Sequence, residues 1–383
     1  MTQTVLLGDI CLQITDGTHS TVKDNENGNY YLLSAKNVKD RIIITDKERK
    51  IDRPTLESLR RRTKTARNDV LVTSVGTIGE TAIIKDETPE YEFQRSVLIL
   101  KPNVEIVHPQ YLYYYMRSLK SSFISMATGA VQKCLFIGQM KNVSVDLPDI
   151  DTQKEIVDVL GTIDEKIELN RKMNEKLEQM GQALFRHYFI DNPEVEEWKA
   201  GTVDHLFTLT MGLSPKGESY NNVGDGVLLL NGAADFTGAS ITPKRYTSSP
   251  TRISRSGDII FCIRGTIGNV CIGYEEYCLG RGVAAMTPTE HAVSYVYFST
   301  IRAIAEMELA ASGSVIRGLS KDDIAKRKVN LPPEDILKTF EAKALPLIER
   351  VRVNSEEIQT LTTLRDTLLP RLISGKIKIN GTD

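Results

Sequence analysis

Apolar residues recur at spacings of three and four over two long stretches of the chain, residues 151–188 and residues 333–374. This spacing places apolar side chains on one face of an α-helix, so the pattern predicts two helices of unusual length. Adding 184 to a position in the first stretch gives its counterpart in the second, so that Ile163 corresponds to Leu347. The chain is therefore an internal duplication in which each half ends in a long helix.

The apolar positions of the two predicted helices form a seam of the kind found in coiled coils. Because each helix follows an equivalent domain, we expect the helices to pack antiparallel about a pseudo-twofold axis. Asn170 and Asn354 occupy matched positions, where an asparagine either fixes the register from within the seam or faces solvent at its edge. A helix of about 35 residues spans roughly 50 Å and would serve as a rigid spacer. The apolar positions of the predicted seam are Ile156, Leu160, Ile163, Ile167, Leu177, Met180 and Leu184 in the first helix and Leu345, Ile348, Val351, Ile358, Leu361, Leu364 and Leu368 in the second.

Short β-branched strands, turn-rich loops and a few shorter helices precede each long helix, which predicts mixed α+β domains. In the first half, residues 69–74, 81–85 and 96–101 are the clearest strands, and residues 109–126 are predicted to form one helix opened by Pro109. The fold class is thus α+β, with two pseudo-symmetric globular domains joined by two long antiparallel coiled-coil helices. We expect a first domain, a central helix, a second domain and a C-terminal helix over residues 1–150, 151–190, 191–333 and 334–383.

The strands of the two halves keep their sequence pattern, whereas the loops between them differ. The segment DVLVTSVGTIG at residues 69–79 matches DIIFCIRGTIG at residues 258–268, and Arg95 matches Arg281. A common scaffold with two sets of loops is typical of a protein that carries two specificities.

At 383 residues, with 41% hydrophobic and 26% charged residues, the chain is expected to be a soluble protein of two domains. No apolar run reaches the length of a membrane span and the N-terminus lacks the pattern of a signal sequence, so we expect a cytoplasmic protein. The five cysteines form no CxxC pair and are expected to be reduced, partly buried thiols.

The net charge of −2 does not by itself indicate a nucleic-acid-binding protein, but the charges are unevenly distributed. Lys and Arg outnumber Asp and Glu by 20 to 18 in residues 1–150 and by 14 to 12 in residues 198–333, whereas residues 151–197 carry 6 basic and 12 acidic residues. Phosphate would repel the acidic helix, which should therefore face protein or solvent. The two weakly basic domains could bind DNA only through local patches.

The sequence lacks the motifs of common catalytic sites. There is no GxxxxGK[ST] loop, no GxGxxG after a strand and no glycine motif for S-adenosylmethionine. The five histidines are scattered, and none recurs in the repeat. The sequence therefore indicates a chain that binds rather than one that catalyses.

Several repeated positions carry residues suited to a polyanion, and each also has a purely structural interpretation. The glycines of the two GTIG segments either form β-turns or bring backbone N–H groups close to phosphate. Arg95 and Arg281 could read guanine or bridge phosphates, or could pair with a carboxylate. Lys133 and Arg317 each follow a matching Gly/Ser loop.

The densest positive cluster is Arg60, Arg61 and Arg62 in a predicted helix of the first half. It is either a solvated helix face or a clamp for phosphate. His19 lies in a polar loop, where it is either a contact residue or part of a turn.

The duplication, the paired helices, DGTH at residues 16–19, the GTIG turns and LLPRLISGKI at residues 368–377 together resemble the specificity subunit of type I restriction-modification systems. The resemblance covers essentially the whole chain and rests on the ordered set rather than on one motif. It implies two target-recognition domains, each reading one half of a split double-stranded DNA sequence. It also implies that the helices set the gap between the half-sites and dock two methyltransferase subunits.

The resemblance assigns the chemistry to partners and no cofactor or metal to this chain. S-adenosylmethionine and adenine methylation belong to the methyltransferase subunits, and ATP, Mg²⁺ and cleavage belong to a motor-nuclease subunit. The alternative is a two-domain scaffold that joins partner helices without recognising DNA. The candidate DNA-binding residues are Thr18, His19, Lys36, Arg60, Arg61, Arg62, Gly76, Thr77, Arg95, Lys133, Lys216, Asn231, Arg264, Thr266, Arg281 and Arg317. The candidate docking residues on the helices are Ile163, Ile167, Asn170, Leu177, Leu184, Leu347, Val351, Asn354, Leu361 and Leu368.

Overall fold

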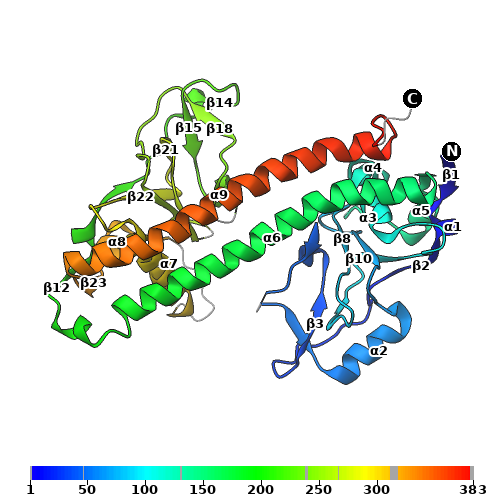
Figure 1. Ribbon diagram of the computed structural model, residues 1–383, viewed down its shortest axis with the longest axis horizontal. Helices are drawn as coiled ribbons and strands as arrows, with labels where there is room; N and C mark the ends of the chain where they lie inside the picture. Colours follow the sequence, from blue (N-terminus) through cyan, green and yellow to red (C-terminus); the bar gives the residue numbers. More distant parts are fainter. Residues whose placement is uncertain are drawn as a thin grey trace. The chain divides into compact units, whose positions relative to one another are not determined.

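The computed structural model describes residues 2–45, 47–129, 132–237, 240–265, 267–310 and 318–379. The chain divides into two compact units (Figure 1). Unit 1 combines Met1–Glu165 with Thr362–Asp383, and unit 2 is Lys166–Leu361. Each unit therefore contains one globular domain together with a segment of both long helices.

The two long helices are α6, Ile150–Phe189, and α9, Glu334–Ile373. Each has 40 residues, and both of their ends are separated by the 184 residues of the repeat. Within unit 2, the Lys343 ammonium of α9 donates a hydrogen bond to the Tyr188 hydroxyl of α6 at 2.6 Å, and Asn174 of α6 donates to Ser355 of α9 at 3.1 Å. The contact nearer the end of α6 is made by a residue nearer the start of α9, so the helices run in opposite directions. The predicted antiparallel pairing is therefore confirmed.

The seam of this helix pair contains buried asparagines. Asn170 and Asn354 are both 0% exposed. Asn354 Nδ2 donates to Asn174 Oδ1 at 2.8 Å, and Asn170 Nδ2 donates to Glu357 Oε2 at 2.8 Å. A shift of one helix along the other would leave these polar groups buried without partners, so they fix the register. The alternative, in which the asparagines face solvent, is wrong.

Two residues that were predicted to lie in the buried seam are exposed, so the prediction is wrong at these positions. Met180 and Leu364 are 53% and 46% exposed, while the next residue along each helix, Gly181 and Arg365, is buried. Local contacts decide burial here, because Arg365 forms ion pairs inside unit 1 and the ring of Phe298 lies over Gly181 in unit 2. The remaining apolar seam positions are buried or half-buried, namely Ile156, Leu160, Ile163, Ile167, Leu177, Leu184, Leu345, Ile348, Val351, Ile358, Leu361 and Leu368.

The domain of unit 1 is built on an antiparallel four-stranded sheet in the order β2-β10-β7-β8. A second sheet has the order β6-β3-β9, and the first strand, β1, pairs with β11. The strands are β1 Gln3–Leu6, β2 Cys11–Asp16, β3 Tyr30–Leu33, β4 Val38–Lys39, β5 Arg41–Ile42, β6 Arg49–Ile51, β7 Val70–Thr73, β8 Thr81–Ile83, β9 Tyr91–Phe93, β10 Val97–Pro102 and β11 Ser144–Leu147. The helices are α1 Leu7–Ile10, α2 Arg53–Thr63, α3 Pro109–Ser118, α4 Lys120–Met126 and α5 Ile137–Lys141.

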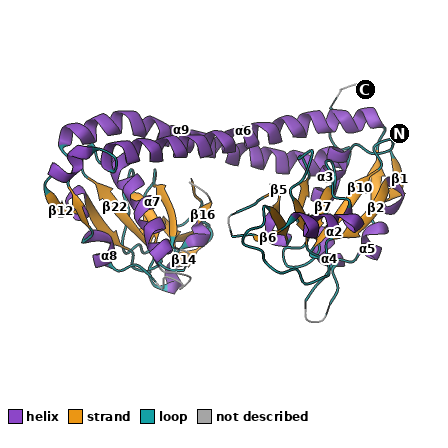
Figure 2. Ribbon diagram, turned by 90° about the horizontal axis from the view of Figure 1, so that it is seen from below, coloured by secondary structure: helices purple, strands orange, loops and turns teal. Residues whose placement is uncertain are grey.

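The domain of unit 2 repeats this plan (Figure 2). Its sheet order β13-β22-β19-β20 corresponds to the four-stranded sheet of unit 1, and β12 pairs with β23 as β1 pairs with β11. The strands are β12 Ala200–Thr202, β13 Phe207–Met211, β14 Tyr220–Asn221, β15 Val227–Leu230, β16 Phe236–Thr237, β17 Ser240–Ile241, β18 Arg245–Thr247, β19 Ile259–Cys262, β20 Gly268–Ile272, β21 Tyr277–Leu279, β22 Val283–Pro288 and β23 Lys328–Asn330. The helices are α7 Val293–Ala310 and α8 Lys321–Ala325. The α+β class and the duplication are therefore confirmed.

Local differences from the prediction have simple causes. The predicted helix over residues 109–126 is interrupted at Leu119, where α3 ends and α4 begins. Strand β9 was not predicted, because its partner is the parallel strand β3, with Tyr31 opposite Tyr91, far away in the sequence. Of the described residues, no helix has the length and apolar composition of a membrane span, and all five cysteines are free thiols.

In unit 1, a buried ionic cluster joins α3 to the helix pair. The guanidinium of Arg365, whose residue is 1% exposed, donates to Asp164 Oδ1 at 2.7 Å and to Asp366 Oδ1 at 2.9 Å. The Tyr114 hydroxyl donates to Asp164 Oδ2 at 2.7 Å, and Arg117 donates to Asp366 at 3.1 Å. The cluster thus ties together α3, α6 and α9 within one unit.

In unit 2, the corresponding positions are apolar. The side chain of Phe298 lies directly over Gly181, where an added Cβ would be 2.2 Å from the ring. Phe298 and Ile348 belong to the same hydrophobic core, and the Phe298 ring lies 6.2 Å from that of Phe340. At the repeat offset of 184, Phe298, Ile348 and Gly181 are the counterparts of Tyr114, Asp164 and Arg365. We call the contact of α3 or α7 with the long helices a joint. The joint of unit 1 is ionic, and the equivalent joint of unit 2 is aromatic.

We expect Arg365→Met to lower the free energy of unfolding by about 3 kcal/mol, because it leaves the half-buried Asp164 carboxylate without its cation. Arg186→Met is the matched control, since Arg186 forms an exposed helix-end ion pair with Asp191 and its loss should change stability by less than about 1 kcal/mol. Urea-induced unfolding measures both values.

Replacing the whole cluster should behave differently from removing one partner. The combination Tyr114→Phe, Asp164→Ile and Arg365→Gly transfers the apolar arrangement of unit 2 and should recover most of the stability that Arg365→Met loses. Equal stability of Arg365→Met and the wild type would show that the cluster does not hold the unit together.

Candidate nucleic-acid interface

The loops that carry the repeated motifs of unit 1 meet at one edge of its four-stranded sheet. The register places Leu98 opposite Asp16 and Val97 opposite Thr73, so β2 and β7 end where β10 begins. The segments that leave these strand ends are residues 16–19, 74–79 and 94–96, and the segment 132–138 joins them through a bridge between Val75 and Cys134. We call these four segments loop edge 1.

Loop edge 1 borders an open hollow of about 810 Å³. The structure thereby brings together side chains that are far apart in the sequence. Of the predicted site residues, His19, Arg62 and Arg95 line it, and Thr18, Gly76 and Lys133 are adjacent to lining residues. The lining residues are Asp16, His19, Arg62, Ser74, Val75, Gln94, Arg95, Ser96, Leu98, Gln132, Cys134, Leu135, Phe136, Ile137 and Gly138.

Asp16 organises the charges in this hollow. Its Oδ1 accepts a hydrogen bond from Arg62 Nη1 at 3.0 Å, and its Oδ2 lies 2.6 Å from His19 Nε2. Arg62 Nη2 also donates to the carbonyl oxygens of Asp16 and Gly17. The guanidinium of Arg62 is thus engaged within the protein, where it holds the loop of residues 16–19 in place.

The arginine cluster of α2 is not a free phosphate clamp. Arg60 Nε donates to Glu92 Oε1 at 3.3 Å, and Glu92 also accepts from Thr63 and Thr65 at 3.0 and 2.9 Å. Burial raises the pKa of Glu92, although these hydrogen bonds oppose the shift. With Arg60 and Arg62 both paired internally, only Arg61 of the three is exposed without an ion pair to the described residues.

The GTIG segment of unit 1 forms a tight turn, as one of the two interpretations requires. Gly76 and Gly79 have φ angles of 77° and 83°, a conformation that favours glycine. Thr73 Oγ1 donates to the Thr77 carbonyl inside the turn, and Thr77 itself is exposed. The turn is therefore structural, and its exposed tip lies on loop edge 1.

Two further predicted residues of unit 1 have mainly structural contacts. The Lys36 ammonium lies 2.9 Å from Glu48 Oε2. Thr18 forms a backbone bridge to Gln94, and its hydroxyl accepts from the Ser20 N–H at 3.1 Å. Neither contact removes the residue from the surface, since Lys36 and Thr18 both stay at least partly exposed.

Among the lining residues that sequence reasoning missed, Gln94, Gln132 and Phe136 have side chains available to a ligand. The two amides form no side-chain hydrogen bond with the described residues, and Phe136 is 54% exposed. Phe136 follows Leu135 in an apolar stretch that predicts a buried residue. The only sequence signal for the amides is their position next to repeated basic residues, Arg95 and Lys133.

Unit 2 has an equivalent edge, which we call loop edge 2. Met211 lies opposite Ala284 and Cys262 opposite Val283, so residues 212–216, 263–265 and 280–282 leave neighbouring strand ends. The Arg281 N–H donates to Ser214 Oγ at 3.2 Å, much as the Arg95 N–H of unit 1 donates to the Thr18 carbonyl at 3.0 Å. The two edges therefore share their backbone plan.

The basic side chains of loop edge 2 are open to solvent. Arg264 and Arg281 are exposed and form no ion pair with the part of the chain that the structure describes. Lys216 is exposed and lies 3.9 Å from the equally exposed Glu218. Asn231 is half-buried, and its backbone N–H donates to Asp235 at 2.7 Å. The predicted Thr266 and Arg317 lie outside the described residues.

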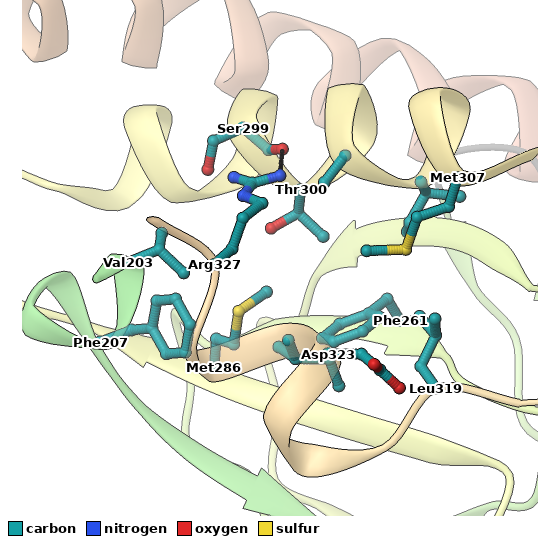
Figure 3. A pocket seen from close by; sticks show the side chains of 13 residues that line it. Val203, Phe207, Phe261, Met286, Ser299, Thr300, Met307, Leu319, Asp323 and Arg327 are labelled. Atoms are coloured by element: carbon teal, nitrogen blue, oxygen red, sulfur yellow. Dashed lines mark hydrogen bonds between the residues drawn. The ribbon is translucent and has the colours of Figure 1, made fainter. Parts of the chain in front are cut away.

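A second, narrow hollow lies beneath α7 in unit 2 (Figure 3). Its wall is mainly apolar and includes Phe207 and Met286, and Arg327 Nη1 donates to the Ser299 carbonyl at 3.3 Å. Burial lowers the pKa of the Arg327 side chain. Most of its lining residues belong to the hydrophobic core of unit 2, so we assign this hollow to the core rather than to loop edge 2. No group of residues that could hold a metal ion occurs among the described residues.

Two matching loop edges on a duplicated α+β scaffold define a modular recognition protein without a visible catalytic centre in the described residues. Comparison with known proteins assigns its class. The model of the "Type I restriction modification DNA specificity domain" matches residues 2–179 and 195–359, and the chain belongs to this family.

Individual relatives agree with this assignment. A protein of Methanocaldococcus jannaschii assigned as the MjaX type I restriction enzyme specificity subunit is 28% identical over 327 residues, covering 79% of this chain and 76% of that protein. The HindI specificity subunit of Haemophilus influenzae is 21% identical over 392 residues, covering 78% and 84%. The crystal structure of a type I system S subunit from M. genitalium has the same fold, with a TM-score of 0.59 at 15% identity over 97% of this chain and 96% of that one.

Loop edge 1 depends on the absence of a side chain at residue 17. A Cβ on Gly17 would lie 2.2 Å from the Phe93 carbonyl oxygen and 2.3 Å from that of Gln94. We expect Gly17→Ala to lower the free energy of unfolding by about 1–3 kcal/mol, because neighbouring backbone must move. Gly138→Ala is the control in the same hollow, since its Cβ would meet nothing within 4 Å. Thermal unfolding that ranks the two variants equally would contradict the close backbone approach.

Proposed function

We propose that this chain is the sequence-specific specificity subunit of a type I restriction-modification complex that recognises a bipartite target in double-stranded DNA. Each loop edge reads one half-site, and the long helices act as the spacer and dock two adenine methyltransferase subunits. Those subunits bind S-adenosylmethionine and methylate adenine. A motor-nuclease subunit, which uses ATP and Mg²⁺, is a further partner. This chain supplies recognition and no catalytic group.

The observation that carries the proposal is the repetition of one loop edge with different side chains. Both edges present exposed guanidinium groups that lack an ion pair to the described residues, Arg95 in unit 1 and Arg264 and Arg281 in unit 2. Arginine bonds guanine bidentately in the major groove and also bonds phosphate. Because loop edges 1 and 2 expose different side chains on the same scaffold, they suit a DNA target whose two halves differ in sequence.

Exposed apolar residues on the long helices support the proposal that two copies of one partner dock there. The seam residues first proposed for docking are buried or half-buried, and two of them, Leu184 and Leu368, pack against the domain cores. Other apolar residues are exposed instead, Leu169 and Met180 on α6 and Val353 and Leu364 on α9, at 54%, 53%, 41% and 46%. They form two repeat-matched pairs, because 184 residues separate Leu169 from Val353 and Met180 from Leu364.

The spacing of these residues puts them on one face of each helix. On α6 and on α9, the two exposed residues are 11 positions apart, which is close to three helical turns. What supports a contact surface is that the same two positions are apolar and exposed on both helices. Since each helix carries the same pair, identical partner subunits would find the same surface twice.

We expect Arg264→Ala or Arg281→Ala to change one half-site of the methylated motif and to leave the other half-site intact. Loss of a residue that reads a base should lower the discrimination between bases at one position of the motif by about 5- to 150-fold. Loss of a residue that contacts phosphate should weaken binding to all sequences alike and reduce the slope of log affinity against log salt concentration by about one. Methylome sequencing of cells that co-express the cognate methyltransferase identifies the motif. Binding by the purified complex at several salt concentrations separates the two roles.

Arg302→Ala is the control, because Arg302 is paired with Glu306 on α7 at 2.6 Å. It should alter neither the motif nor the affinity. If the chain with its methyltransferase retains no DNA at any salt concentration, it is a scaffold without DNA recognition. If it binds DNA but both variants keep the wild-type motif and affinity, loop edge 2 is not the reader.

We expect glutamate at Leu169, Met180, Val353 and Leu364 together to abolish binding of the methyltransferase, because a carboxylate would be desolvated in an apolar contact. Glutamate at Leu169 and Met180 alone, the pair on α6, should leave one of the two methyltransferase subunits bound. Native mass spectrometry counts the bound subunits. Val223→Glu is the control, as Val223 is 87% exposed and belongs to the loop after β14 rather than to either long helix. Two bound copies in the fourfold variant would place the docking surface elsewhere.

A further inference from the structure

The hollow of loop edge 1 has a mixed polar and apolar wall, and Phe136 is its exposed large apolar side chain. Phe136 is 54% exposed, yet its backbone is held firmly. Its N–H donates to Gln139 Oε1 at 2.9 Å, and the amide of Gln139 donates to the Met126 carbonyl at 2.8 Å. The preceding Leu135 N–H donates to the Ser74 carbonyl at 3.0 Å. The ring is therefore presented from a fixed position rather than from a loose loop tip.

The hydrogen-bonding groups around this ring are of two kinds. Arg62 and Asp16 are engaged with each other and with backbone carbonyls. Gln94, Arg95 and Gln132 also line the hollow, and their side chains form no hydrogen bond or ion pair with the described residues. The groups left for a ligand are thus two amides, one guanidinium and one aromatic ring.

We propose that Phe136 contacts the C5-methyl group of a thymine in the major groove, and that the amides of Gln94 and Gln132 bond the adenine edge beside it. This inference rests on the proposed function, because it names the base pair that loop edge 1 reads. In the major groove an adenine–thymine pair presents a methyl group next to an acceptor, a donor and a second acceptor. Glutamine bonds adenine N6 and N7 through both of its amide atoms, and an apolar side chain contacts the thymine methyl.

Guanine is a poor fit for the same groups. Its recognition uses an arginine or lysine fork, and the guanidinium of Arg62 is already engaged by Asp16 and two carbonyl oxygens. Arg95 also lines the hollow and is exposed without an ion pair to the described residues, so it is available for phosphate or for a guanine next to the adenine–thymine pair. A protein partner would also cover an exposed ring, but the unengaged amides of Gln94 and Gln132 in the same hollow match the hydrogen-bonding edge of a base pair.

The experiment uses the complex of this chain with its cognate methyltransferase and a duplex that carries the motif found by methylome sequencing. Each thymine of the motif is replaced in turn by deoxyuridine, which removes only the methyl group. At one thymine, the wild type should bind about fourfold more weakly, the effect of exposing one methyl-sized group. At that position Phe136→Ala should bind the thymine and deoxyuridine duplexes equally.

The amides are tested at the same position. Gln94→Ala or Gln132→Ala should reduce discrimination between adenine–thymine and guanine–cytosine by about 5- to 150-fold there and leave the other half-site unchanged. Ile124→Ala is the matched control, since Ile124 is 47% exposed and does not line the hollow. It should keep the full response to deoxyuridine.

Two results would overturn the inference while leaving the proposed function intact. One is a Phe136→Ala complex that responds to deoxyuridine as the wild type does. The other is a Phe136→Ala variant that loses its methyltransferase but keeps its base preference, which would make the ring a protein contact. A wild-type complex with no sequence preference at all would instead refute the proposed function, and the inference with it.

Discussion

The antiparallel pairing of α6 and α9 is the constraint on which both units depend. Neither domain is completed by its own half of the chain, because each buries residues from both helices. In unit 1, Leu160 of α6 and Leu369 of α9 belong to the same core as β2 and α3. In unit 2, Phe185 of α6 and Phe340 of α9 do the same, with ring centroids 6.1 Å apart. The hydrogen bonds of Asn170 and Asn354 then fix how far one helix is displaced along the other.

The same scaffold tolerates two different chemistries where α3 or α7 meets the helices. The ionic joint around Arg365 in unit 1 and the aromatic joint around Phe298 in unit 2 occupy equivalent positions. A buried ion pair is stable only while all its members are present, whereas aromatic packing depends mainly on volume. The joints could therefore diverge as long as each changed as a set. The loop edges, which carry no such constraint, are free to differ in the side chains they expose.

The repeat and the helices could be predicted because they rest on periodicity and on matched positions within one sequence. The buried stripe was partly misplaced for a physical reason: the ion pairs of Arg365 and the ring over Gly181 decide burial there, and neither is visible in the apolar pattern. The candidate site was predicted at the level of loops. The pairing of Arg62 with Asp16 is a tertiary contact across 46 positions, so sequence alone could not show that this charge is engaged. Phe136 was missed because an apolar residue is expected to be buried.

The pairing of the helices is tested most directly by the distance between two spin labels in unit 2, at the exposed positions Gln182 on α6 and Lys343 on α9. Antiparallel helices in the observed register place these positions close together, which predicts a separation below about 20 Å. A parallel pair aligned by the repeat would put Gln182 beside Asp366, 23 residues from Lys343, and would give a separation of about 35 Å or more. Double electron–electron resonance distinguishes the two. The shorter distance is the result we predict, and the longer one would contradict the account.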